Sequence, residues 1–417
     1  MKIENLRLRI RLDDIETLLF ELQTPSTSQN RVNTRQGTRL KQERCRRLRE
    51  EKVIVKQSLN RIIYPILTVP VEITSEIFLQ CLPDRLTEPR AYSAPFLLGQ
   101  ICSVWRQIAL NNPRLWAALH VRYSGNGRHF QNLIQNWLPR AGSVPFSLSL
   151  TLPPKHCYFF SPRMCYCPSS APFVDYWSRL TCFNGIYFTL QECIDLLSRA
   201  PNLTVGKFSY LDGFLSSTKT ATCVIQLDNI KDLYFHTVYS TPGPSSLLES
   251  LSAPCLQSLS IHCLSGHITD KPFFSFLRKS PCIHTFDLTL EYISQEADIA
   301  LLKAMPALEV FQLNFSCSTA IVFAILSLLD DDESATFLPR IRKLAFGNFN
   351  PRFRFTWEDS FTKILFNALN SRCDSAKSGT AQLGSFEFHC SITNPQDAKL
   401  NDCLTKLKAK GIRVFVA

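Results

Sequence analysis

The sequence predicts an α/β protein in which helices come first and a row of repeated helix–strand units follows. Apolar side chains recur at helical spacing in two stretches of the first 64 residues, and prolines divide residues 69–119 into short helical patterns. Beyond residue 119, an apolar triplet recurs behind successive prolines. We therefore expect a coiled-coil-like helical region at 1–64, a three-helix module at 65–121 and a solenoid with a curved parallel sheet at 122–417.

The N-terminal region contains two stretches with apolar stripes, separated by the polar segment 24–38. The first stripe consists of Leu6, Ile10, Ile15, Leu18, Leu19 and Leu22, and the second of Leu40, Leu48, Val55, Leu59 and Ile62. Stripes of this kind are buried either in a hairpin of the two helices or against another chain. The sequence leaves both arrangements open, and self-association is one of them.

The same region is the basic part of the chain, with 15 Lys or Arg against 8 Asp or Glu, or +7 of the formal +11. The densest run consists of Arg39, Lys41, Arg44, Arg46, Arg47 and Arg49. Such a run can contact nucleic-acid phosphates. Because Glu43, Glu50 and Glu51 interleave with it and no aromatic residues do, a solvated helix face is the favoured interpretation.

The module at 65–121 shows helix signals of its own. Pro70, Pro95 and Pro113 suit first helical turns, and Asn112 suits an N-cap. The second predicted helix carries an apolar face made of Leu98, Ile101, Cys102, Trp105, Ile108 and Ala109. Three short helices bury a thin core, so this module should lean on a partner or on the rest of the chain.

Three motifs in this module carry a family resemblance: Val69-Pro70-Val71-Glu72-Ile73, Cys102-x-x-Trp105 and Pro113-x-Leu115-Trp116. They resemble the F-box, with Val69 in place of the usual leucine, and the whole layout is similar to the large F-box-like families of mushroom-forming fungi. The resemblance implies docking on the adaptor subunit of a cullin-RING ubiquitin ligase. It places the adaptor surface or its support at Pro70, Ile73, Ile77, Phe78, Cys102, Trp105, Leu115 and Trp116.

The remainder of the chain repeats one pattern, in which positions two, five and seven after a proline are apolar. The triplets are Leu256, Leu259 and Ile261; Ile283, Phe286 and Leu288; Leu308, Phe311 and Leu313; and Ile341, Leu344 and Phe346. A short helical pattern precedes the first three prolines, and the first spacings of 27 and 25 residues lie in the leucine-rich-repeat range. Ile230, Leu233 and Phe235 fit a unit without proline, while Gly206 and Lys207 predict a bulged or shifted strand.

Side chains of a strand alternate, so the residues between the triplets should project from the sheet. The exposed face predicted in this way includes Asp232, Tyr234, Ser258, Ser260, Thr285, Asp287, Gln312 and Lys343. In the resembled family, this face would hold the protein to be ubiquitinated. An ordinary solvated face is the alternative for any one of these residues.

The motifs of common enzymes are missing from the sequence, so we expect no catalysis and no cofactor. The cluster Cys157, Cys165 and Cys167 fits no common zinc spacing, and no metal is expected. Apolar runs are too short for a membrane span and a secretory signal is missing, which predicts a cytoplasmic or nuclear protein with reduced cysteines. The favoured function is a ligase substrate receptor with adaptor, cullin and an unknown target as partners; a leucine-rich scaffold and a basic nucleic-acid-associated protein remain alternatives.

Overall fold

The computed structural model describes most of the 417 residues. The described ranges are 2–23, 35–60, 65–83, 88–123, 127–152, 176–211, 224–237, 245–263, 271–290, 295–315, 320–330, 337–348, 359–373, 380–389 and 398–416. They form two compact units, Met1–Ile77 and Phe78–Ala417, with the boundary inside one helix. The predicted module 65–121 is therefore divided between the two units.

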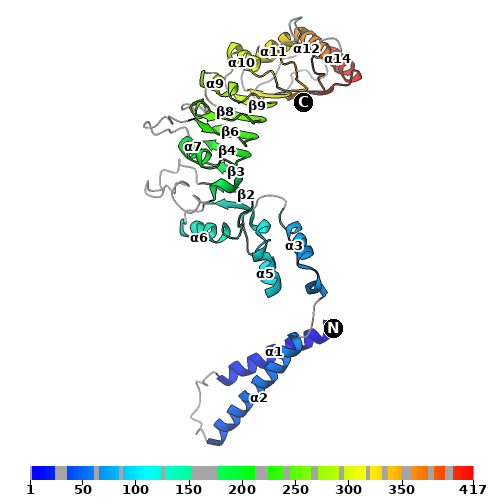
Figure 1. Cartoon of the computed structure of the whole chain (residues 1–417). Coiled ribbons are helices and arrows are strands. Elements are labelled where there is room, and N and C mark those ends of the chain that lie inside the picture. The colour runs from blue at the N-terminus through cyan, green and yellow to red at the C-terminus, as the bar shows by residue number, and fades with distance from the viewer. Residues whose placement is uncertain are drawn as a thin grey trace, which may run out of the picture. The chain divides into compact units, whose positions relative to one another are not determined.

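The first unit contains a helical hairpin, the 3-10 turn η1 (Pro65–Thr68) and the first part of α3 (Val71–Gln80). Helices α1 (Lys2–Gln23) and α2 (Arg35–Asn60) pack on each other around a small core of Ile15, Leu19, Leu48 and Val55. Ion pairs from Arg11 to Glu51 (2.8 Å) and from Lys52 to Glu16 (2.7 Å) flank that core. Of the two arrangements left open by the sequence, the chain adopts the hairpin (Figure 1).

The second unit begins with short helices and continues as an α/β array of strands and helices in alternation (Figure 1). Its helical elements are α4 (Leu98–Ile101), α5 (Ser103–Asn111), η2 (Pro113–Trp116), α6 (Gly127–Trp137), η5 (Trp177–Arg179), α7 (Leu190–Arg199), α8 (Ser245–Glu249), α9 (Lys271–Arg278), α10 (Gln295–Lys303), α11 (Ala320–Asp330), α12 (Asp359–Ser371) and α14 (Ala398–Ala409).

The strands form an eleven-stranded, wholly parallel sheet that follows chain order without exchange. Its members are β1 (Ala118–Arg122), β2 (Phe146–Thr151), β3 (Leu180–Ile186), β4 (Val205–Leu211), β6 (Asp232–Thr237), β8 (Ser258–Cys263), β9 (Thr285–Leu290), β10 (Val310–Phe315), β11 (Lys343–Asn348), β12 (Ser385–His389) and β13 (Arg413–Val416). The short strands β5 (Ile225–Gln226) and β7 (Leu251–Ser252) form a separate pair. The predicted parallel sheet is confirmed.

The predicted triplets form the core of this sheet. Leu259 pairs in register with Phe286, Ile261 with Leu288, and Phe286 with Phe311, and all of these side chains are buried. Helix side chains such as Phe273 and Leu326 belong to the same continuous apolar cluster. Because a parallel strand cannot return without a crossover, each helix both makes the connection and covers the apolar face.

Three local expectations need correction. The predicted helix over Leu98–Ala109 is broken, because Cys102 is extended (φ −157°) and its Sγ accepts the N–H of Trp105, which starts α5 anew. Pro95 precedes α4 by three residues and does not open it. The irregularity expected at Gly206 lies further along, since Gly206 pairs in register with Leu233 and the register shifts after Phe208.

The predicted cluster Cys157, Cys165 and Cys167 falls on residues outside the described ranges. The cysteines in the described ranges, such as Cys182 and Cys193, form no disulfide bonds with one another. None of the helices in the described part of the chain combines the length and hydrophobicity that a bilayer span needs.

Candidate functional site

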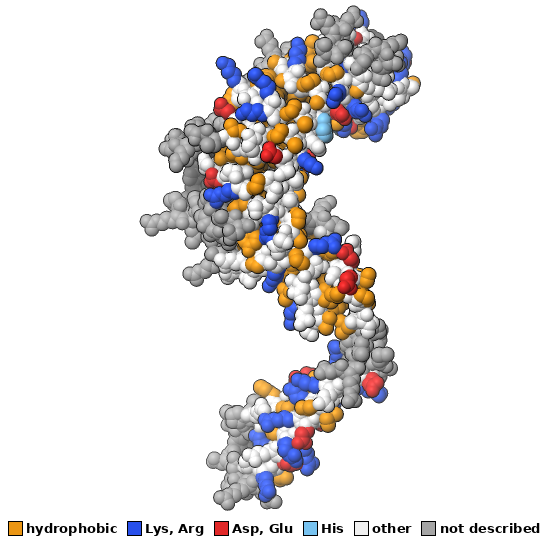
Figure 2. Space-filling view, in the orientation of Figure 1, with side chains coloured by type: hydrophobic (Ala, Val, Ile, Leu, Met, Phe, Trp, Pro, Cys, Tyr) orange, Lys and Arg blue, Asp and Glu red, His pale blue; other side chains and the backbone are white. Residues whose placement is uncertain are grey.

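Two surfaces of the second unit and the helices of the first unit are candidates for function. The helical segment α4–α5 exposes apolar side chains, with Ile101 55 % and Val104 43 % exposed. In the same segment, the ring of Trp105 packs edge-on against Phe78 with centroids 4.9 Å apart. Apolar atoms held at the surface by a packed aromatic pair are typical of a docking face, and Figure 2 shows hydrophobic side chains exposed over α5.

A tryptophan pair fixes this segment to the sheet. Trp116, which is 2 % exposed, donates its indole N–H to the carbonyl of Ala109 (2.8 Å), and Trp137 donates to the carbonyl of Trp116 (2.8 Å). The two rings meet edge-on at 4.9 Å, and the guanidinium of Arg140 lies 4.5 Å from the centroid of Trp116. The end of α5 is thus joined to η2, and η2 to α6, by hydrogen bonds, and η2 leads into β1.

The predicted adaptor residues divide into three groups by exposure. Phe78, Leu115 and Trp116 are buried and can support a docking face without contacting a partner. Cys102 and Trp105 are half-buried, and Cys102 serves as the N-cap of α5. In the first unit, Pro70, Ile73 and Ile77 are exposed. In the second unit, sequence reasoning missed the exposed Leu97 and Val104, because neither lies on the apolar helical stripe.

The second surface is the sheet face formed by the residues between the buried triplets, which we call the open face. All eight predicted residues lie on it and are partly or fully exposed: Asp232, Tyr234, Ser258, Ser260, Thr285, Asp287, Gln312 and Lys343. The register aligns them in rows across successive strands. The first row runs through Asp232, Ser258 and Thr285, and the second through Tyr234, Ser260, Asp287 and Gln312. Lys343 belongs to the first row, two strands beyond Thr285, and binds Glu387 on β12 (2.7 Å), which lowers the pKa of that carboxyl.

A third row of the open face was not predicted. His236, His262, Thr289 and Asn314 occupy the next outward position on β6, β8, β9 and β10. The signal was available, because the same alternation that predicted Ser258 and Ser260 continues to His262. Tyr187 and Tyr210 join this row at the ends of β3 and β4, with positive φ values of 66° and 56° that no sequence pattern indicates.

The electrostatics of this row follow from partial burial. Burial, reinforced by the neighbouring His262, lowers the pKa of His236 below its ordinary value. Burial, together with the charge of Asp287, raises the pKa of Tyr234. Both groups are therefore neutral near pH 7, while the carboxylate of Asp287 faces His262 across 3.2 Å.

At the far end of the sheet, a cavity of about 620 Å³ is bordered by Lys343, Glu387, Lys408, Arg413 and Phe415 among others. Its charges are mixed, and Lys343 is already paired with Glu387. Within the described ranges, no group of three or more His, Cys, Asp or Glu side chains is placed to hold a metal ion.

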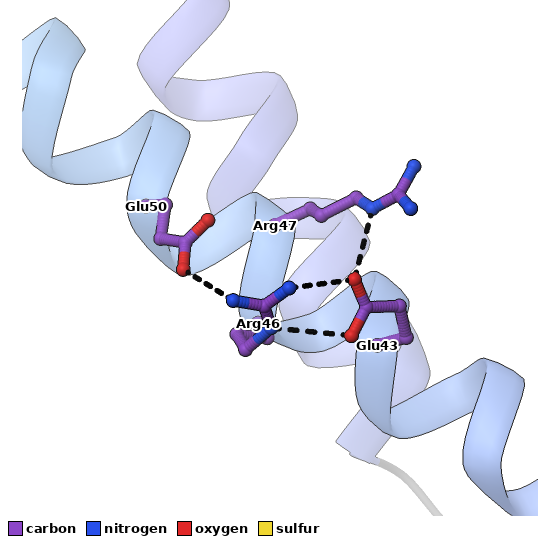
Figure 3. A network of polar contacts seen from close by, with 4 residues as sticks. All are labelled: Glu43, Arg46, Arg47 and Glu50. Carbon is purple, nitrogen blue, oxygen red and sulfur yellow. Dashed lines mark hydrogen bonds and ion pairs between the residues drawn. The ribbon is translucent and has the colours of Figure 1, made fainter.

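The basic run of the first unit is partly neutralised within its own helix. Glu43 binds Arg46 (2.8 Å) and Arg47 (3.2 Å), and Arg46 also reaches Glu50 (3.1 Å), as Figure 3 shows. Hydrogen bonds from Arg46 and Arg47 lower the pKa of Glu43 to about 2. Two of the six cations are thus engaged locally, which supports the solvated-face interpretation.

No protein-family model matches the chain, and no curated protein matches it either. The functional argument therefore depends on the two exposed surfaces and on the sequence motifs themselves.

Proposed function

We propose that this protein is the substrate-recognition subunit of a cullin-RING ubiquitin ligase, with an F-box-like segment that docks on the adaptor and a leucine-rich-repeat solenoid that binds a protein target. The observation that carries the proposal is the exposed apolar surface of α4–α5, where Ile101 and Val104 face solvent in the segment whose Trp105 packs on Phe78. Burial of such side chains against a partner removes apolar surface from water and so stabilises the complex. The motif Cys102-x-x-Trp105 lies in this segment, and Pro113-x-Leu115-Trp116 follows it as η2.

The tryptophan pair links the proposed docking helix α5 to the rest of the second unit. A receptor must hold its target at a defined place relative to the ligase, so its adaptor-binding helices and its target-binding surface must belong to one rigid body. Here Trp116 bonds η2 to α5 and Trp137 bonds α6 to η2, and η2 leads within two residues into β1, the first strand of the sheet that carries the open face. In this proposal, the chain supplies binding and positioning, and ubiquitin transfer takes place on other subunits.

Co-purification tests the proposal. The full chain is co-expressed with an adaptor subunit of the cullin-RING class, and the complex is separated by size exclusion. We expect a stoichiometric complex that Ile101→Asp or Val104→Asp weakens at least tenfold, equivalent to about 1.4 kcal/mol of binding free energy. Val224→Asp, a matched change at another exposed apolar position of the same unit, should leave the complex intact. An adaptor that never co-elutes, or that binds all variants equally, refutes the proposal.

A second candidate function is a scaffold that assembles through its N-terminal helices, and one observation favours it. Beyond its small core, the hairpin exposes Leu6, Ile10, Val53 and Ile54. If a second copy covers these side chains, light scattering of the purified chain will give a dimer mass that falls to the monomer in a Leu6→Lys, Ile10→Lys variant. A monomer for the unaltered chain excludes this candidate.

A further inference from the structure

A continuous cluster of rings crosses the open face from the end of β3 to β8. The centroids of Tyr187 and Tyr210 are 5.1 Å apart, and those of Tyr210 and His236 are 4.9 Å apart. His236 lies 6.1 Å from His262, which also meets Tyr234 at 5.0 Å. Rings gathered in this way on a surface provide large contact area at little loss of conformational entropy, which is typical of binding anchors.

The backbone that presents two of these rings is strained. Tyr187 and Tyr210 both adopt left-handed backbone conformations, which cost energy in any residue other than glycine. Tyr187 directly follows β3, Tyr210 is the penultimate residue of β4, and the sheet register shifts around Tyr210. Tyr210 is nevertheless 43 % exposed, so its ring is displayed to solvent and its burial does little to stabilise the unit.

A carboxylate lies at the end of the ring cluster and is held in place by polar contacts. The Oδ2 of Asp287 lies 3.2 Å from Nε2 of His262, and its Oδ1 accepts from Nδ2 of Asn314 at 3.4 Å. The same Nδ2 reaches Oγ1 of Thr289 at 3.1 Å. On the next strand, Gly347 makes room for this amide, because a Cβ at that position would collide with Oδ1 of Asn314.

The charge of this carboxylate is available to a ligand. The side chain of Asp287 is 24 % exposed, and that of His262 26 %. Among the described residues, no Lys or Arg forms an ion pair with Asp287 or with Asp232 on the same face, whereas Glu387 is paired with Lys343. Lys207, which neighbours Tyr234 in the register, makes no ion pair with the described carboxylates either.

We propose that this cluster, formed by Tyr187, Tyr210, Tyr234, His262, Asp287 and Asn314, binds an arginine side chain of a protein partner. A guanidinium stacks on aromatic rings and donates paired hydrogen bonds to a carboxylate, and His262 and Tyr234 provide such rings beside Asp287. Tyr187 and Tyr210 lie at strands further along the face, where they can contact the residues that flank the arginine. The inference rests on the proposed function only in that the open face binds a protein. It adds the chemical class of the residue that is recognised.

The test measures binding to four pools of fluorescent nine-residue peptides by anisotropy. The pools share uncharged random flanks and differ at the central residue, which is arginine, lysine, citrulline or glutamate. We expect the full chain to bind the arginine pool at least tenfold more tightly than the citrulline pool. Equal affinities, a preference for glutamate, or no binding of any pool overturns the inference.

Variants of the chain test which residues are responsible. Asp287→Asn should abolish the preference for arginine over citrulline, and Tyr210→Asn, which suits the left-handed backbone, should weaken the arginine pool without lowering the thermal midpoint. Lys207→Gln removes a neighbouring cation and should strengthen the same pool, while Glu387→Gln on the distant part of the face should change nothing. An arginine preference that persists in Asp287→Asn would refute the assignment.

Two further measurements separate this inference from its alternatives. Binding to an oligosaccharide panel, with no binding to the peptides, would assign the cluster to a carbohydrate and overturn the proposal. Adaptor binding is recorded on the same samples. Adaptor binding without arginine preference rejects the cluster assignment alone, whereas arginine preference without adaptor binding rejects only the ligase role.

Discussion

The bond between the indole of Trp116 and the carbonyl of Ala109 should carry much of the stability of the junction between α5 and the sheet. Trp116→Phe keeps a ring but removes the N–H donor, so a buried carbonyl loses its partner, at a cost of about 1–3 kcal/mol. The smaller ring also weakens the edge-on contact with Trp137, which contributes about 0.5–1.5 kcal/mol. We therefore expect a loss of about 2–4 kcal/mol.

The same helix region offers a matched control. Trp105 is half-buried and packs edge-on against Phe78, but its ring forms no hydrogen bond with the described residues. Trp105→Phe should therefore lower stability by less than about 1 kcal/mol. Urea denaturation gives the difference in unfolding free energy, and hydrogen exchange locates it, because the Trp116 variant should accelerate exchange in α5 and β1 selectively.

Two outcomes would refute this reasoning. If Trp116→Phe costs no more than Trp105→Phe, the indole hydrogen bond does not hold the junction. If exchange accelerates evenly along the sheet and not at α5 and β1, the tryptophan pair stabilises the unit as a whole and does not couple these two parts.

Three further predictions follow from single contacts. Gly185→Ala should lower the free energy of unfolding by about 1–3 kcal/mol, and with it the thermal midpoint, because the new Cβ would lie 2.7 Å from the buried ring of Phe183. Gly384→Ala, where the nearest atom would lie 3.7 Å from the new Cβ, should be close to neutral. Arg372→Ala should cost about 3–5 kcal/mol in urea denaturation, since it frees the buried carbonyls of Phe337 and Leu338; a loss below 1 kcal/mol would mean that water replaces the guanidinium. Because the pKa of Glu43 is lowered from 4.5 to about 2, its ionised carboxylate should stabilise α2 at pH values above 4.5, and this contribution should be lost as the pH falls from 4.5 to about 2. Circular dichroism should therefore show a smaller acid-induced loss of helix in Glu43→Gln than in the unaltered chain. Equal losses would exclude a role for this carboxylate.

The sequence predicts the sheet because burial on one face leaves a periodic trace. Apolar residues such as Leu259 and Ile261 stand at the same distance behind successive prolines, and the structure places the equivalent residues of neighbouring strands side by side. The outward residues follow from the same alternation, which is why Ser260 and Asp287 could be named in advance. The exposed part of the helical segment α4–α5 was harder to predict from the sequence, because apolar residues such as Val104 look alike whether they face a core or a partner.

The features that could not be predicted depend on tertiary contacts. Cys102 resembles any apolar helix residue in sequence, and only its extended backbone and its contact with the N–H of Trp105 reveal the break. The left-handed conformations of Tyr187 and Tyr210 contradict the intrinsic preference of tyrosine, so local propensity gives no sign of them. Gly347 is informative only once Asn314 is known to lie across from it.

The strict chain order of the sheet has a consequence for how such a protein can change in size. Each interior strand from β2 to β12 pairs only with its two neighbours in the row, so the array is close to one-dimensional in its energetics. Duplicating or deleting one helix–strand segment would lengthen or shorten the recognition surface by about 4.8 Å while leaving the segments on either side in their existing pairings. Reach and specificity can thus be adjusted in separate steps, the first by segment number and the second by the outward side chains.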